Sequence, residues 1–123
     1  MYDACQALRR WELPSKDPME PFFRITVEEA REMVQRPEVA VIDVRTPAEY
    51  ESGHVPGAIL LPVDSLYGRT DELPRNKELL MVCGVGQRSA LACEIAASAG
   101  LEQIYNLEGG TMEWIEKGNP IER

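Results

Sequence analysis

A cysteine stands at the start of a short glycine-containing segment, residues 83–89, which reads Cys-Gly-Val-Gly-Gln-Arg-Ser. Glycine adopts positive φ angles without steric cost, so Gly84 and Gly86 allow a tight loop whose successive N–H groups converge on one point. A thiol at that point, beside the N-terminus of a following helix, has a lowered pKa and is ionised near neutral pH. The segment therefore predicts a nucleophilic Cys83 thiolate in a cradle for an anionic sulfur species or an oxyanion.

The residues on either side of this loop predict where it lies in the fold. Residues 79–82 (Leu-Leu-Met-Val) form a short apolar run with the character of a buried strand, and the residues after Arg88 read as a helix that runs to Gly100. Cys83 would then lie at the carboxyl end of a strand. Ligands bind beyond that end in sheets of parallel strands, so this position agrees with a reactive role.

The rest of the chain alternates between strand and helix signals. Residues 26–29 and 46–49 are capping boxes; the first opens a helix to about residue 35 and the second a short helix that stops at Gly53. Residues 63–68 and 111–117 read as further helices, with an irregular stretch between residue 68 and residue 77. Apolar or β-branched runs occupy residues 39–43, 58–61 and 104–107, and the ordered pattern begins near residue 23. Strands that alternate with helices predict an α/β domain with a mainly parallel sheet covered by helices on both faces.

Length and composition bound the architecture and the class of partner. The 123 residues suffice for one domain, expected over residues 23–123, whereas the proline-interrupted residues 1–22 are expected to be an arm or linker. A net charge of −8 argues against nucleic acid or an anionic membrane surface as the partner, because both require a basic patch. No run has transmembrane length and the N-terminus lacks the apolar core of a signal peptide, so we expect a cytoplasmic protein.

The cysteine pattern favours free thiols. Cys5, Cys83 and Cys93 are an odd number, with no C-x-x-C pair and no cluster with the one histidine, His54. A disulfide framework and a structural zinc site are therefore not expected, and we expect no bound metal or cofactor. Reduced thiols agree with the expected cytoplasmic location.

Three stretches of the chain, in order, carry recognisable motifs. Residues 43–50 (DVRTPAEY) run into residues 53–58 (GHVPGA), residues 83–89 read CGVGQRS, and residues 107–114 read LEGGTMEW. Together they resemble the rhodanese family of sulfurtransferases, whose motifs are D-x-R-x-x-x-E-[FY] with G-H-[IV]-P-G-A, then C-x-x-G-x-R-S, then L-x-G-G-x-x-x-W. The resemblance covers about residues 23–120 and implies a single rhodanese-like domain with a mainly parallel five-stranded sheet.

The resemblance implies a thiosulfate sulfurtransferase type of enzyme that works in two steps through Cys83. The thiolate takes the outer sulfur of a donor such as thiosulfate, a thiosulfonate or another persulfide, and a thiol or cyanide then takes that sulfur from the cysteine persulfide. The loop N–H groups would hold the terminal sulfur, and Arg88 would bind an anionic donor. The expected donor site comprises every loop residue after the cysteine: Gly84, Val85, Gly86, Gln87, Arg88 and Ser89.

Two residues of the first motif are expected to support the site. Asp43, at the end of a strand, would either line the site or bind loop N–H groups. Arg45 and Glu49 are four residues apart, but Arg45 precedes the helix, so a supporting ion pair between them is expected rather than catalysis. The resemblance also implies structural roles for Arg45 and Glu49.

Four other candidates are given structural or incidental roles. Cys93 lies ten residues beyond Cys83, roughly 15 Å along a helix axis, so it is expected to pack in the core rather than to resolve a disulfide. His54 lies in a turn and Trp114 on the last helix, and both are expected to be structural. Cys5 is expected to be an incidental thiol on the arm.

Two other classes of function stay open. Cysteine phosphatases and some arsenate reductases share the cysteine–loop–arginine arrangement, but their loop is longer and fits a tetrahedral oxyanion, whereas here only residues 84–87 intervene. A non-catalytic interaction module, or a sulfur relay restricted to a partner such as a sulfur-carrier protein, is the other alternative. The donor also stays open. Arg88 is the only cation of the loop, and family members that prefer thiosulfate often carry more positive charge there, which weakens the thiosulfate assignment and leaves persulfide or mercaptopyruvate donors open as well.

Overall fold

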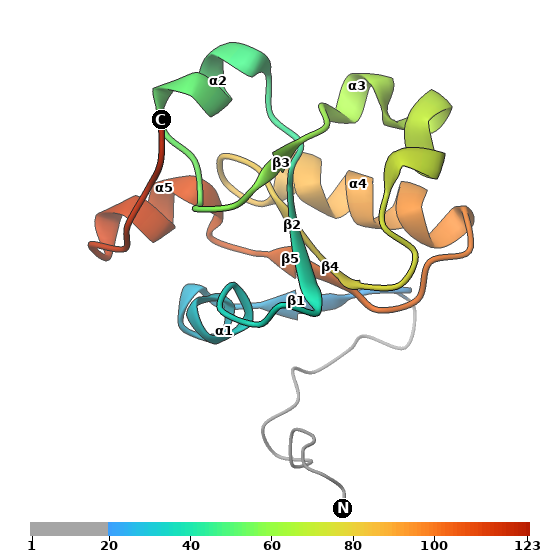
Figure 1. The fold of residues 1–123 in the computed structure, drawn as a ribbon, viewed down its shortest axis with the longest axis horizontal. Helices are drawn as coiled ribbons and strands as arrows, with labels where there is room; N and C mark the ends of the chain where they lie inside the picture. The colour runs from blue at the N-terminus through green and yellow to red at the C-terminus, as the bar shows by residue number, and fades with distance from the viewer. Residues whose placement is uncertain (1–19) are drawn as a thin grey trace, which may run out of the picture.

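The computed structural model describes residues 20–123 of the chain. The expected arm over residues 1–22, with Cys5, lies outside this part except for residues 20–22. Phe22 is completely buried in the hydrophobic core, so the folded body includes this residue. Figure 1 shows the sheet in the middle of the body, with helices on either side of it.

The sheet has five strands, and all of its strand pairs are parallel. The strands are β1 (Phe23–Ile25), β2 (Val39–Asp43), β3 (Ile59–Leu60), β4 (Glu78–Val82) and β5 (Ile104–Leu107). Their order across the sheet is β1-β5-β4-β2-β3, which places β4 in the centre. The prediction of a mainly parallel five-stranded sheet is confirmed.

Helices cover both faces of the sheet, as the alternating sequence pattern predicts. They are α1 (Val27–Met33), α2 (Pro47–Ser52), α3 (Val63–Leu66), α4 (Gln87–Ser98) and α5 (Gly110–Glu116), with a 3₁₀ segment at Tyr67–Glu72. One face of the sheet packs against α3 and α4, and the other packs against α1 and α5 (Figure 1). The crossover helices therefore shield both faces from water, as parallel sheets require.

Both capping boxes form at the predicted positions. The hydroxyl of Thr26 accepts from the N–H of Glu29 at 3.1 Å, and the Glu29 carboxylate accepts from the N–H of Thr26 at 2.8 Å. The same exchange joins Thr46 and Glu49, at 3.3 Å and 3.1 Å. Each box satisfies donors of a first helical turn that have no partner within the helix. The second box also fixes Glu49 at the start of α2.

The central strand β4 explains the position of the predicted nucleophile. Leu79 and Met81 pack on the α4 side of the sheet, whereas Leu80 and Val82 pack on the α1 and α5 side. All four are completely buried, which is why this strand reads as a continuous apolar run. Cys83 follows directly and packs on the α4 side.

Several element boundaries differ from the prediction. The first helix ends at Met33 instead of near residue 35, because Pro37 disfavours helical backbone just before it. Part of the stretch expected to be irregular forms the 3₁₀ segment, and α4 begins at Gln87, before the predicted start after Arg88. No helix within residues 20–123 combines the length and the apolar character needed to cross a membrane.

Candidate active site

Cys83 is the first residue after β4 and is completely buried. Its Sγ accepts a hydrogen bond from the N–H of Gly86 at 3.1 Å and another from the hydroxyl of Ser89 at 3.3 Å. Residues 83–89 thus curl around the sulfur and end in the first turn of α4. The prediction that this cysteine lies between the end of a strand and the start of a helix is confirmed.

The surroundings of Cys83 lower the pKa of its thiol. Burial is the largest single influence and acts in the opposite direction, because it disfavours the charged thiolate. The hydroxyl of Ser89 and the backbone N–H groups of Ser89, Gly86 and Val85 together outweigh burial, since each is directed at the sulfur. Hydrogen-bond donors of the loop itself therefore stabilise the thiolate.

Cys93 has the opposite environment. It lies in α4, is completely buried, and its Sγ donates a long hydrogen bond of 3.6 Å to the carbonyl oxygen of Tyr105. Burial raises the pKa of this thiol far above its usual value. The expectation that Cys93 packs in the core is confirmed, and such a thiol stays protonated.

The first turn of α5 holds two carbonyl groups of the loop. The N–H of Thr111 donates to the carbonyl oxygen of Cys83 at 2.8 Å, and the N–H of Met112 donates to that of Gly84 at 3.1 Å. Helix-start N–H groups such as these have no partner within their own helix. Because the Gly84 oxygen faces α5, the N–H on the other side of the same peptide group, that of Val85, faces the sulfur.

Asn106 in β5 holds a third carbonyl group of the loop. Its side-chain N–H donates to the carbonyl oxygen of Gly86 at 3.1 Å and also to the carboxylate of Glu108. Asn106 is completely buried, and its Oδ1, like Oγ1 of Thr111, is a buried atom without a partner among residues 20–123. No sequence pattern pointed to Asn106 or Thr111, because their contacts with the loop arise only when β5 and α5 pack beside β4.

Two glycines allow the loop and the start of α5 to approach each other. Gly86 has a φ of 98°, and a Cβ placed there would lie 2.2 Å from the carbonyl oxygen of Glu108. Gly110 has a φ of 66°, and a Cβ there would lie 2.2 Å from the carbonyl oxygen of Gly84. No side chain fits at either position. Gly110 of the third motif thus allows α5 to approach the loop of the second motif.

Arg88 forms a two-point ion pair with Glu49 at the start of α2. Its Nη1 and Nη2 lie 2.8 Å and 2.9 Å from the two carboxylate oxygens of Glu49. Arg88 is the first cause of the lowered pKa of Glu49, about 2, and the backbone N–H of Thr46 adds to it. The expected ion pair between Arg45 and Glu49 is therefore wrong: α2 turns Glu49 toward the loop, where Arg88 lies.

Arg45 instead pairs with Asp43. Its Nη2 lies 2.7 Å from Oδ2 of Asp43 and donates at 2.8 Å to the carbonyl oxygen of Gly53, and its backbone N–H bonds the same carboxylate at 3.1 Å. Both side chains are buried, at 7% and 0% exposure. Within residues 20–123, all the hydrogen bonds that the Asp43 carboxylate accepts come from Arg45, and the pair ties the end of β2 to the turn after α2.

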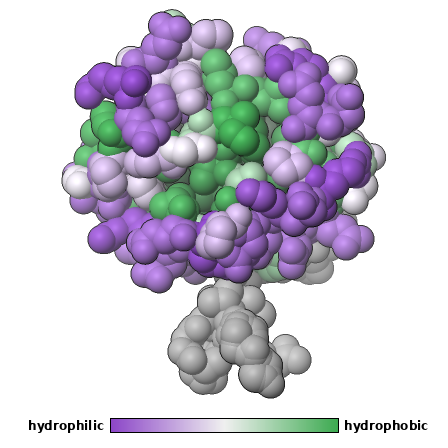
Figure 2. Space-filling view, viewed as in Figure 1, coloured by the Kyte–Doolittle hydropathy of each residue, from purple (hydrophilic) through white to green (hydrophobic). Residues whose placement is uncertain are grey.

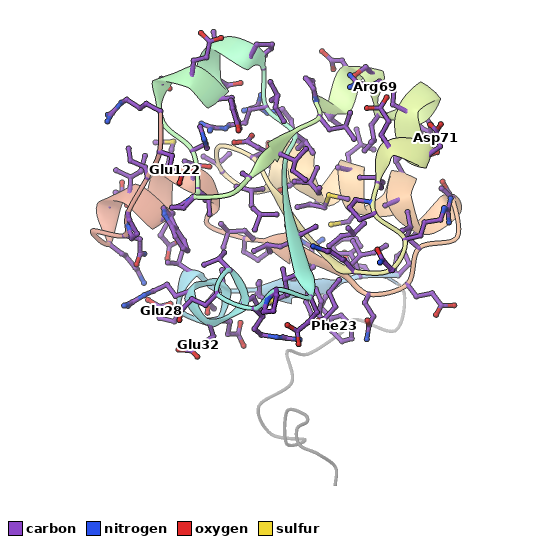
Figure 3. The ribbon with its side chains drawn as sticks, viewed as in Figure 1. Phe23, Glu28, Glu32, Arg69, Asp71 and Glu122 are labelled. Carbon is purple, nitrogen blue, oxygen red and sulfur yellow. The ribbon has the colours of Figure 1, made fainter. Side chains whose placement is uncertain are left out.

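The structural interpretations of His54 and Trp114 are confirmed. The His54 ring stacks on the ring of Tyr50 with centroids 3.7 Å apart, and its Nδ1 lies 2.8 Å from the Tyr50 carbonyl oxygen. The backbone N–H and carbonyl groups of His54 and Glu122 exchange two hydrogen bonds of 2.9 Å, which makes an antiparallel β-bridge. Figure 3 labels Glu122 in the C-terminal segment near α2. Trp114 is buried on α5, and its indole N–H donates to the carbonyl oxygen of Pro120 at 2.7 Å.

The rim of the loop exposes apolar side chains. Val85, inside the loop, is 54% exposed, and Met112, whose N–H holds Gly84, is 57% exposed. A further apolar band runs between α2 and α3 on the face seen in Figure 2. Hydrophilic residues surround this band.

Most of the described chain resembles known proteins. Residues 26–117 match the family model described as "Rhodanese-like domain". The chain is 36% identical over 84 residues to a protein named Sulfurtransferase from Allochromatium vinosum, and the match covers 68% of this chain and 78% of that protein. It is 31% identical over 96 residues to the thiosulfate sulfurtransferase GlpE of Tolumonas auensis, covering 78% of this chain and 91% of that protein. The crystal structure of a rhodanese-related protein from Thermoplasma volcanium matches with a TM-score of 0.74 and 32% identity, covering 80% of this chain and 96% of that chain.

Proposed function

Since the chain belongs to the rhodanese-like domain family, we propose that it is a sulfurtransferase that carries sulfur as a persulfide on Cys83. Relatives named as sulfurtransferases support the general activity. The observation that carries the role of Cys83 is the pair of hydrogen bonds that its buried Sγ accepts from Gly86 and Ser89. Donors directed at a sulfur stabilise a thiolate and, after transfer, the negative charge of a persulfide.

The first step loads the cysteine. The Cys83 thiolate attacks the outer sulfur of a donor, and a new S–S bond forms as the donor's own bond to that sulfur breaks. The electron pair of the broken bond leaves with the rest of the donor, which is sulfite when the donor is thiosulfate. The lowered pKa of Cys83 raises the ionised fraction of its thiol, so the step does not depend on a separate general base.

The second step returns the enzyme to its starting state. An acceptor thiolate or cyanide attacks the terminal sulfur of the persulfide, and the bond between the two sulfur atoms breaks. The electron pair of that bond returns to Cys83 as thiolate, and the product is the acceptor's persulfide or thiocyanate. The acceptor is a small thiol, cyanide or a sulfur-carrier protein. In both steps, the N–H groups of Val85 and Gly86 stabilise the negative charge on the sulfur atoms.

The proposed chemistry fits a reducing compartment such as the cytoplasm. Persulfide formation requires a free thiol at Cys83, and an oxidising compartment favours disulfides. Cys83 and Cys93 are both unpaired and buried.

Intact-protein mass spectrometry tests the proposal. The reduced protein is incubated briefly with thiosulfate or with benzenethiosulfonate, measured, and then treated with cyanide. We expect a gain of one sulfur atom that peptide mapping assigns to Cys83 and that cyanide removes as thiocyanate. Folded, reduced protein that gains no sulfur from either donor, or gains it at another residue, would contradict the proposed role of Cys83.

Matched serine variants of the two buried cysteines complete this test. Cys83→Ser should abolish the sulfur gain and the turnover while the far-ultraviolet circular dichroism spectrum stays unchanged. Cys93→Ser should still gain one sulfur atom, because that thiol is protonated and lies inside α4.

A further inference from the structure

Glu49 neutralises the only cation of the cysteine loop. The two oxygens of its carboxylate bind the two terminal nitrogens of Arg88, at 2.8 Å and 2.9 Å. Such two-point pairing uses the guanidinium edge that would otherwise bind an oxyanion. The carboxylate is itself held in place, because its Oε1 also accepts from the N–H of Thr46 at 3.1 Å.

This ion pair lies beside the backbone of the cysteine loop. A Cβ on Gly84, the residue after the nucleophile, would lie 3.3 Å from Nη2 of Arg88, so the guanidinium rests against the loop itself. Arg88 and Glu49 are 40% and 39% exposed, which places them at the surface. The pKa of Arg88 is raised first by Glu49, and the negative charges of Cys83 and Asp43 add to the effect. A donor that approaches Cys83 therefore meets a carboxylate together with the guanidinium.

Exposed apolar side chains also border the loop. Val85 and Met112 both expose more than half of their surface. Val85 is part of the loop, and the backbone N–H of Met112 donates to the carbonyl oxygen of Gly84 in the loop. Exposed apolar side chains favour an organic group over a hydrated inorganic anion.

We propose that Glu49 determines donor specificity, so that the site prefers a singly charged organic sulfane donor, such as an organic thiosulfonate, over doubly charged thiosulfate. The inference rests on the proposed sulfurtransferase function. Glu49 acts through Arg88 and is a positioning and charge-compensating residue.

The two donors undergo the same bond changes, so their comparison isolates charge and apolar contact. With benzenethiosulfonate, the Cys83 thiolate takes the outer sulfur and benzenesulfinate leaves with the electron pair. With thiosulfate, sulfite leaves in the same way. One negative charge enters and leaves in the first reaction and two in the second. The loss of Arg88 as an anion partner, because Glu49 occupies its terminal nitrogens, therefore weighs more heavily on thiosulfate.

The variant Glu49→Gln removes the charge and little else. Glutamine keeps the side-chain length and an oxygen that can accept from Thr46, since either residue serves in a capping box. We expect kcat/KM for thiosulfate to rise about fivefold relative to that for benzenethiosulfonate, mainly through KM, as a partly exposed charge contact allows. Glu51→Gln changes an exposed carboxylate on the same helix and is the matched control for net charge.

A double-mutant cycle separates this role from a purely structural one. In an Arg88→Gln background, Glu49→Gln should no longer improve the relative use of thiosulfate, because the two residues act as a pair. An unchanged donor ratio in Glu49→Gln, or the same ratio change in Glu51→Gln, would overturn the proposal.

A binding measurement distinguishes this inference from the proposed function. Sulfite should protect Cys83 from alkylation more strongly in Glu49→Gln than in the unmodified protein, whether or not sulfur is turned over. Absence of turnover with every donor would contradict the sulfurtransferase proposal, whereas equal protection by sulfite would contradict the role of Glu49 alone.

Discussion

Asn106 donates a hydrogen bond of 3.1 Å to the carbonyl oxygen of Gly86, from a completely buried position in β5. The N–H of the same glycine donates to the sulfur of Cys83. One buried amide thus orients a donor of the predicted nucleophile, although it does not touch the sulfur. The strand next to β4 therefore takes part in shaping the site.

Asn106→Ala should raise the pKa of the Cys83 thiol, because Gly86 loses the contact that orients it. The rate of iodoacetamide alkylation as a function of pH measures this pKa. The curve should shift to higher pH, and Asn76→Ala, an exposed change far from the loop, should leave it in place. An unshifted curve for Asn106→Ala in folded protein would show that Gly86 is oriented without this amide.

Ser89→Ala should weaken the thiolate directly. The lost hydroxyl is the strongest of the donors that lower the thiol pKa, and a hydrogen bond to a charged group is worth about 1.5–3 kcal/mol. Alkylation at neutral pH should slow by about tenfold and recover at high pH, where the thiol ionises unaided. Ser98→Ala is the control: its hydroxyl binds the Ile95 carbonyl oxygen at the far end of the same helix, so alkylation should not change.

Gly110→Ala should destabilise the protein and deform the loop. The added methyl group would collide with the carbonyl oxygen of Gly84, and the φ of 66° is unfavourable for alanine. We expect a loss of about 3 kcal/mol in the free energy of unfolding, measured by urea titration. Gly118→Ala is matched in backbone angle, with a φ of 78° and open space around it, so it should lose only about 1 kcal/mol.

The ion pair between Glu49 and Arg88 should make stability depend on acid pH. The pKa of Glu49 is lowered from 4.5 to about 2 by folding, so its contribution is fully present above pH 4.5 and disappears as the pH falls toward about 2. Urea titrations across this window should reveal a smaller decline in stability for Glu49→Gln than for the unmodified protein. The difference between the two declines should be modest, because the Glu49 and Arg88 side chains are partly exposed. Equal declines in the variant and the unmodified protein would indicate that folding does not lower the pKa of Glu49.

The elements of the fold were predictable from local patterns, whereas the contacts of the site were only partly so. The apolar run in β4 and the capping box at Thr46 each depend on neighbouring residues, and both formed as predicted. The partner of Glu49 was predicted wrongly, because sequence spacing favoured Arg45 and the fold brings Arg88 against it. No sequence pattern pointed to Asn106 or Thr111. Their partners are backbone groups of the cysteine loop, and only the packing of β5 and α5 beside β4 brings these groups within hydrogen-bond distance.

The contacts between α5 and the cysteine loop have a consequence for the timing of catalysis. Because Thr111 and Met112 already hold the carbonyl groups of Cys83 and Gly84, the peptide dipoles of the loop are aligned before a sulfur donor arrives. In water, solvent dipoles would have to rotate as negative charge moves from one sulfur atom to the next. The peptide dipoles of the loop are already fixed in the favourable orientation. The reorganisation energy of sulfur transfer is thereby supplied during folding and does not recur in each turnover.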